Sequence, residues 1–61
     1  MKKWYGISQL NENEKDLIRG KCIIDNIPFE ISQDYEYYHI EMYMDKNQFK
    51  SMQSFINMIF V

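Results

Sequence analysis

The clearest pattern of apolar and polar positions lies at the carboxyl end of the chain. Six apolar side chains recur there at helical spacing: Phe49, Met52, Phe55, Ile56, Ile59 and Phe60. Asp45 precedes them as a helix-capping residue, and Gln48 three positions later completes a variant of the capping box. The pattern predicts one amphipathic helix that continues to Val61, with its apolar face on the core and Met58 off that face.

Strict alternation replaces the helical period in the preceding segment, Tyr35 to Met44, and predicts a long β-strand. One side of this strand carries Tyr38, Ile40, Met42 and Met44, with Glu36 at its edge. The other side carries Tyr35, Tyr37, His39, Glu41 and Tyr43. Because the first set is the more apolar, we expect it to face the core and the second set to point away from it.

A second alternating run, Ile27 to Ile31, predicts a strand before this one, with Gln33-Asp34 as the turn between them. Pro28 cannot donate a hydrogen bond to a neighbouring strand, so it favours an edge strand or the first residue of a strand. Further upstream, Leu17 to Ile24 is predicted to be a strand, and Asp25-Asn26 a two-residue hairpin turn.

The first third of the chain permits two interpretations. Lys3 to Leu10 is rich in strand formers and predicts an opening strand. Asn11-Glu12-Asn13-Glu14 matches a capping box, which would begin a short helix that ends at Gly20. The same residues also suit a polar hairpin loop between two strands. The favoured prediction is a loop over residues 11–19.

These elements predict an α+β domain: a three- or four-stranded antiparallel β-meander with one C-terminal α-helix packed on one face. The helix would bury its stripe against Ile18, Ile24, Phe29, Ile31, Tyr38, Ile40 and Met42. Sixty-one residues allow one small domain, residues 1–61, which buries only ~60% of its unfolded surface. A single cysteine cannot close an internal disulfide, so a homodimer is the expected source of further stability.

Catalytic chemistry is not predicted. His39 and Cys22 are the one obvious pair of base and nucleophile, but they point to opposite sides of the predicted sheet. Cys22 is expected to be a small buried hydrophobe. Gly6 and Gly20 are isolated and form no phosphate-binding loop. We therefore expect no enzymatic activity, no cofactor and no metal site.

Charge is strongly segregated along the chain. Between Lys21 and Lys46 there is no Lys or Arg, yet this segment holds six carboxylates and four of the five tyrosines. Direct nucleic-acid binding is disfavoured, because phosphate contacts require clustered basic side chains. The sequence has neither a signal peptide nor a run of ~18 apolar residues able to span a membrane, which favours a cytoplasmic location. The lack of Ala and Thr fits A+T-rich codons, as in a low-GC bacterium or its phage.

An acidic, tyrosine-rich surface of this kind is suited to contact with another protein. The expected function is a small intracellular protein-binding module of the phage or mobile-element type, which inhibits another protein by blocking its basic site. Carboxylates spaced along a rigid sheet would stand in for phosphates, as in DNA-mimicking inhibitors, so the partner would itself bind nucleic acid. The expected contact residues are Tyr35, Tyr37, Glu41 and Tyr43, assisted by Asp34, Glu36 and Asp45.

Two alternatives stand beside this hypothesis. In the first, the chain is a structural or assembly subunit, and its tyrosine face is used for homo-oligomerisation. In the second, the tyrosines only form cross-strand aromatic pairs on a solvated sheet, while the acidic run keeps the protein soluble.

Overall fold

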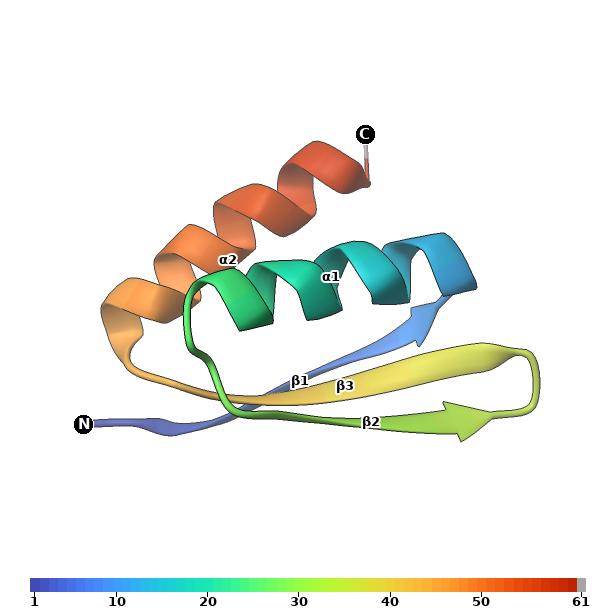
Figure 1. The fold of residues 1–61 in the computed structure, drawn as a ribbon, viewed down its shortest axis with the longest axis horizontal. Helices are drawn as coiled ribbons and strands as arrows, with labels where there is room; N and C mark the ends of the chain where they lie inside the picture. Colours follow the sequence, from blue (N-terminus) through green and yellow to red (C-terminus); the bar gives the residue numbers. More distant parts are fainter. Residues whose placement is uncertain (61) are drawn as a thin grey trace.

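The computed structural model describes residues 1–60 and consists of three antiparallel strands with two helices on one side of the sheet (Figure 1). The elements are β1 (Lys3–Leu10), α1 (Glu12–Ile24), β2 (Phe29–Asp34), β3 (Tyr37–Met44) and α2 (Lys46–Ile59). The strand order is β1-β3-β2, so β3 lies in the centre and runs antiparallel to both edge strands. The predicted α+β class is confirmed, but there are two helices rather than one and the strand order is not that of a meander.

Helix α1 occupies the region for which a loop and a strand were predicted, and both predictions are wrong. Asn11 caps this helix: its Oδ1 accepts from the Glu14 backbone N–H at 2.8 Å, and Glu14 Oε1 accepts from the Asn11 N–H at 2.9 Å. Ile18 and Cys22 are four residues apart and both fully buried, whereas Ile24, predicted to be inward, is 79% exposed. The capping box and the i, i+4 apolar pair therefore specify a helix.

The connection after α1 is not a hairpin turn. Asn26 has a φ of 55°, the left-handed conformation in which many helices end. The Ile27 N–H then donates to the Cys22 carbonyl at 2.8 Å, and the Ile27 side chain is buried. Pro28 directly precedes β2, which is an edge strand, as its missing N–H predicts.

The β2–β3 hairpin turns at Tyr35-Glu36 instead of Gln33-Asp34. Asp34 pairs directly with Tyr37, so only two residues connect the strands. Tyr35 is therefore part of the turn and not the first residue of the long strand. Figure 1 shows this hairpin extending beyond the helices at one end of the molecule.

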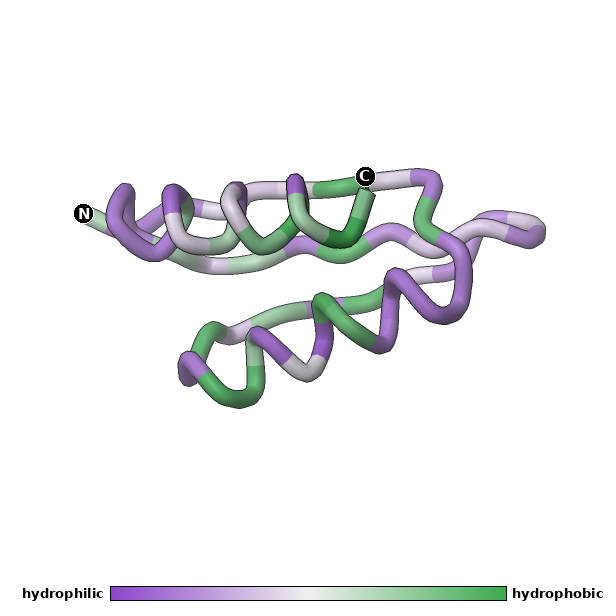
Figure 2. The backbone as a smooth tube through the Cα atoms, turned by 90° about the horizontal axis from the view of Figure 1, so that it is seen from above, coloured by the Kyte–Doolittle hydropathy of each residue, from purple (hydrophilic) through white to green (hydrophobic). Residues whose placement is uncertain are grey.

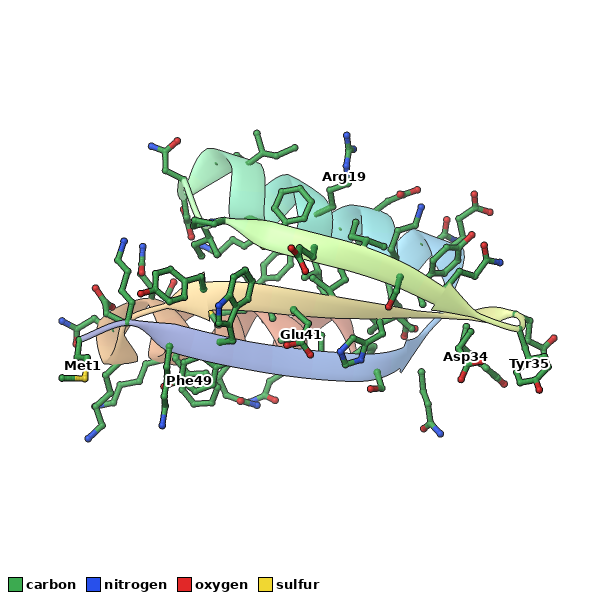
Figure 3. The ribbon with its side chains drawn as sticks, turned by 90° about the horizontal axis from the view of Figure 1, so that it is seen from below. Met1, Arg19, Asp34, Tyr35, Glu41 and Phe49 are labelled. Atoms are coloured by element: carbon green, nitrogen blue, oxygen red, sulfur yellow. The ribbon has the colours of Figure 1, made fainter. Side chains whose placement is uncertain are left out.

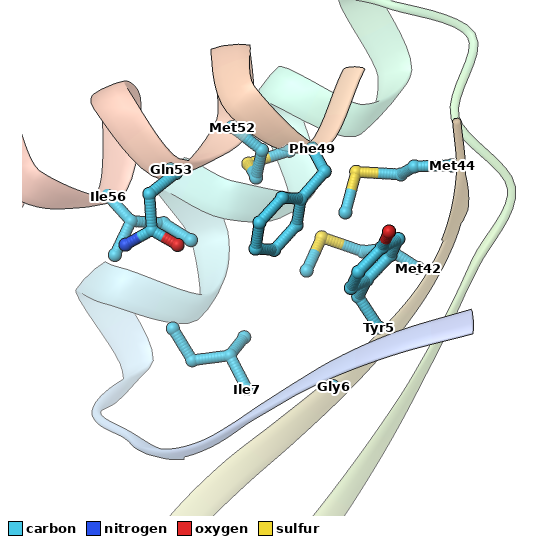
Figure 4. Close-up of a pocket in the computed structure, with 9 residues that line it drawn as sticks. All are labelled: Tyr5, Gly6, Ile7, Met42, Met44, Phe49, Met52, Gln53 and Ile56. Atoms are coloured by element: carbon cyan, nitrogen blue, oxygen red, sulfur yellow. The ribbon is translucent and has the colours of Figure 1, made fainter. Parts of the chain in front are cut away.

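The core lies between the sheet and the two helices, which are seen side by side from above (Figure 2). Its buried residues are Leu10, Ile18, Cys22, Ile27, Ile40, Met42, Met44 and Met52. The predicted inward face of β3 is thus confirmed. Under α2 a small gap of ≈ 110 Å³ remains, where three methionine side chains gather around Phe49 (Figure 4). Phe49 also stacks on Tyr5, with ring centroids 4.3 Å apart.

Helix α2 begins at its predicted cap and ends near its predicted terminus. Asp45 Oδ1 accepts from the Gln48 N–H at 2.8 Å, and the Gln48 side chain accepts from the Asp45 N–H at 3.0 Å. The helix ends at Ile59 with Phe60 as its cap, and Val61 lies outside the described residues. Met58 is 74% exposed, as expected from its position off the apolar stripe. Neither helix is long and apolar enough to cross a membrane.

The buried Cys22 thiol gives a direct test of the core. Burial, with a smaller contribution from the nearby Asp25 carboxylate, raises the pKa of Cys22 from 9.0 to about 11. We expect a thiol reagent at pH 8 to label the folded chain slowly and the urea-unfolded chain rapidly. The unfolded thiol ionises at the lower pH, so the free energy of unfolding should fall as the pH rises from 9.0 to about 11.

The matched control for this prediction is Cys22→Val, which keeps an apolar side chain of similar size. In this variant the free energy of unfolding should fall less between pH 9.0 and about 11, because no thiol ionises on unfolding. Fast labelling of the native wild-type chain at pH 8 would contradict the buried position of Cys22.

Candidate functional site

The candidate functional site is the side of the sheet opposite the helices, the open face. Within residues 1–60 no element covers it, as the view from below shows (Figure 3). The strand registers place on it Trp4, Gly6, Ser8, Glu30, Ser32, Asp34, Tyr37, His39, Glu41 and Tyr43. The predicted outward side of β3 is therefore the centre of this face.

Aromatic side chains lie toward both ends of the open face. Trp4 of β1 is directly opposite Tyr43 of β3, and their ring centroids are 5.3 Å apart at an interplanar angle of 46°. Such cross-strand pairs contribute roughly 0.2–1 kcal/mol to a sheet. Even so, Trp4 is 49% exposed, and Tyr37 toward the other end is 47% exposed. The rings thus stabilise the sheet and still present contact area to a partner.

A chain of hydrogen bonds crosses the centre of the open face. His39 Nε2 lies 2.6 Å from Glu41 Oε2, and His39 Nδ1 lies 2.7 Å from Ser8 Oγ. Gly6 leaves space for the His39 and Glu41 side chains. A Cβ at position 6 would lie 2.7 Å from Glu41 Oε2 and 3.1 Å from the His39 imidazole ring. The absence of a side chain at Gly6 therefore lets His39 and Glu41 lie across β1.

The order hydroxyl, imidazole, carboxylate is also that of a nucleophilic triad. Here, however, the side chains of His39 and Glu41 are 32% and 43% exposed on a sheet surface. The two hydrogen bonds fix the His39 ring and hold the Glu41 carboxylate in place.

The open face is acidic, and most of its charge has no counterion. Glu30 lies directly opposite Glu41 across the β2–β3 ladder, a like-charge arrangement that destabilises a sheet. Strands β2 and β3 contain no Lys or Arg. Within residues 1–60 no Lys or Arg side chain forms an ion pair with Glu30, Asp34 or Glu36. A basic surface on another molecule would therefore relieve repulsion that the folded chain retains.

A hollow of ≈ 440 Å³ lies at the end of the open face, between β1 and the β2–β3 turn. It is lined by Ser8, Gln9, Ser32, Asp34, Tyr35, Tyr37 and His39. On one side, β1 bulges between Ile7 and Leu10, where Gln9 has a φ of 60°. β-Bulges are common beside functional sites, because the extra residue redirects neighbouring side chains.

The opposite rim of the hollow is the turn residue Tyr35, which is 92% exposed and has a φ of 57°. Positive φ at the first turn residue, and not at Glu36, is the type II′ pattern, in which glycine is preferred. A positive φ of this kind costs a residue other than glycine roughly 1–3 kcal/mol. The Gln33 side chain braces the turn by donating to the Tyr35 carbonyl at 3.1 Å. The turn therefore holds an exposed aromatic ring beside the hollow at a cost in backbone strain.

The residues predicted to bind a partner fall into three groups in the structure. Tyr37, Glu41, Tyr43 and Asp34 share the open face, and Tyr35 and Glu36 form the turn beside it. Asp34, Tyr35 and Glu41 are labelled in Figure 3. Asp45 is separate from them, because its carboxylate caps α2.

Sequence reasoning missed Trp4, Ser8, Gln9 and Glu30 as parts of the same surface. The alternation along β1 could have placed Trp4 on the same side of the sheet as Tyr43. The position of Ser8 beside His39 follows from strand pairing and a bulge, which leave no local pattern.

Comparisons with models of protein families, with curated proteins and with solved structures give no match to this chain. Within residues 1–60 no three His, Cys, Asp or Glu side chains are grouped so that they could hold a metal ion.

The strained turn predicts an unusual effect of mutation. Replacing Tyr35 by Gly should raise the free energy of unfolding by about 1 kcal/mol, because Gly adopts a positive φ without a steric penalty and the exposed ring contributes little packing. Urea denaturation measures this change. The matched control is Tyr37→Gly, in the adjacent strand, which should lower stability. A loss of stability in Tyr35→Gly would show that the ring packs on the fold.

Proposed function

We propose that this chain is a small protein-binding module that inhibits another protein by occupying its basic site through the open face and the β2–β3 turn. The observation that supports this most directly is a sheet face that displays uncompensated carboxylates between exposed aromatic rings. Aromatic rings supply large, rigid contact area at low entropic cost. Carboxylates steer the encounter with a basic surface and then pair with its Lys and Arg side chains.

The carboxylates have a geometry suited to replacing phosphates. Glu30 and Asp34 alternate with other residues on the outward side of β2, and Glu41 lies on the next strand. A pleated sheet fixes such side chains in rows, with adjacent strands about 4.8 Å apart. Rows of fixed negative charge are the feature that a nucleic-acid-binding protein recognises in a phosphate backbone. The proposed partner is therefore the nucleic-acid-binding site of another protein.

The proposed setting is the cytoplasm, either of the cell that encodes the chain or of a host cell if a phage or mobile element encodes it. The composition, which fits A+T-rich codons, supports only the source, a low-GC bacterium or its phage.

A second candidate is a homo-oligomeric assembly subunit, and a specific observation favours it. The helical side exposes Leu17 and Ile24 of α1 and Met58 of α2, which are 50%, 79% and 74% exposed. A two-fold dimer through the open face would bring like charges together, which costs stability. Self-association is therefore better suited to the helical side, and it would leave the open face free for a different partner.

The proposed function predicts that partner capture depends on the open face. The double variant Tyr37→Ala/Tyr43→Ala should lose a basic partner that the immobilised wild-type chain captures from cell extract, and capture should weaken as salt increases. Quantitative mass spectrometry of the captured proteins measures this. The matched control, Met58→Ala on the helical side, should retain the partner. The double variant should remain folded, since the lost Trp4–Tyr43 pair is worth roughly 1 kcal/mol or less.

A second double variant keeps the proposal testable if the tyrosine double variant unfolds. Glu30→Gln/Asp34→Asn changes two exposed residues and removes two negative charges with little change in shape. Capture that is unaffected by this variant and by salt would contradict an electrostatic open-face interaction.

The assembly hypothesis has its own test, which is the absolute mass by light scattering over a hundredfold range of protein concentration. If a dimer forms, we expect Leu17→Glu to dissociate it, while Tyr37→Ala/Tyr43→Ala leaves the mass unchanged. The opposite result would place self-association on the open face. A monomeric mass at every concentration would reject the assembly hypothesis.

A further inference from the structure

We propose that the hollow beside the β2–β3 turn is a receptor for an arginine side chain of the partner. This inference rests on the proposed function, because it names the basic group that one part of the site would bind. The hollow lies at the end of the open face that is next to the β2–β3 turn. At this end the hairpin extends beyond the helices (Figure 1). An arginine that projects from a partner surface would enter it from that end without contact with α1 or α2.

The lining of the hollow selects a cation over an anion. Asp34 is its carboxylate, and no Lys or Arg contributes to the lining. Within residues 1–60 Asp34 also has no ion-pair partner. Ser8 and Ser32 add hydroxyl oxygens that can accept hydrogen bonds. An anion would meet the Asp34 carboxylate with no Lys or Arg in the lining to offset its charge.

The two tyrosines in the lining favour arginine among the cations. Tyr35 and Tyr37 both expose ring surface, and the rings belong to the turn and to the strand next to it. A guanidinium group is planar, stacks on aromatic faces and donates two parallel hydrogen bonds to one carboxylate. A lysine ammonium is a compact, strongly hydrated point charge, which neither stacks flat on a ring nor donates two parallel hydrogen bonds to one carboxylate. The combination of one carboxylate with two rings therefore fits arginine better than lysine.

The hydrogen bonds of His39 leave an acceptor available to the bound group. In the tautomer whose Nε2–H donates to Glu41, the Nδ1 of His39 accepts the Ser8 hydroxyl proton. The lone pairs of Ser8 Oγ then remain free to accept from a guanidinium N–H. His39 and Glu41 are thus positioning residues for Ser8.

The test uses the full chain and a blocked amino acid, so no partner protein is needed. The ¹⁵N-labelled chain is titrated with N-acetyl-arginine methylamide at constant ionic strength, and its amide chemical shifts are recorded. We expect saturable shifts at Asp34, Tyr35 and Tyr37. The corresponding blocked lysine should bind more weakly, and blocked citrulline, which has nearly the same shape without the charge, should cause no saturable shift.

Matched variants locate the binding. Asp34→Asn should weaken the affinity for blocked arginine by about tenfold or more, because it removes a charge-assisted hydrogen bond. Glu30→Gln removes the same charge from the open face outside the hollow and should leave the affinity nearly unchanged. Tyr35→Asn removes the ring but keeps a residue that tolerates positive φ, and it should also weaken binding.

Three results would overturn the inference: no saturable shift with blocked arginine, equal binding of blocked lysine, or equal losses in Asp34→Asn and Glu30→Gln. If the chain captures a basic protein through the open face but does not bind blocked arginine, this inference is refuted and the proposed function is not. A chain that binds blocked arginine in the hollow but captures no basic protein would contradict only the proposed function.

Discussion

Strand β3 connects the core to the open face, and its alternation constrains the rest of the structure. Ile40 and Met42 are buried beneath the helices, while His39 and Glu41, their neighbours in sequence, point to the other side. A shift of one residue in register would exchange these two sets. The burial that stabilises the fold therefore also fixes the row of side chains on the open face, because both depend on the same pairing with β1 and β2.

The placement of both helices on one side of the sheet explains why one face carries the core and the other carries polar chemistry. The two helices of the described residues cover one side of the sheet, and both edge strands pair with β3 alone. The opposite side is stabilised by lateral contacts within the sheet: the Trp4–Tyr43 pair and the hydrogen bonds of His39. These contacts keep aromatic and charged groups in fixed positions without a second core. A surface prearranged in this way loses less side-chain entropy when it binds.

Periodicity was sufficient to predict β3 and α2, because each has one unbroken pattern. It failed for α1, since its apolar positions fit an inward strand face as well as a helical stripe. The Asn11–Glu14 capping box was the signal that should have decided the assignment. For the candidate site, the open side of β3 followed from alternation alone. The turn position of Tyr35 and the contact of Ser8 with His39 did not, because they depend on the register of β3 with its neighbours and on a bulge in β1.

The acidic face also restricts the kind of surface that it can meet. Glu30 and Glu41 already oppose each other within one chain, at a cost to the sheet. Contact with a second copy of the same face would bury more like charge and increase that cost, whereas a basic surface would remove it. The residues that destabilise the free chain are thus the ones that would favour a bound state. Repulsion within the chain and attraction to a basic partner have the same origin, which favours a heterologous partner for this face.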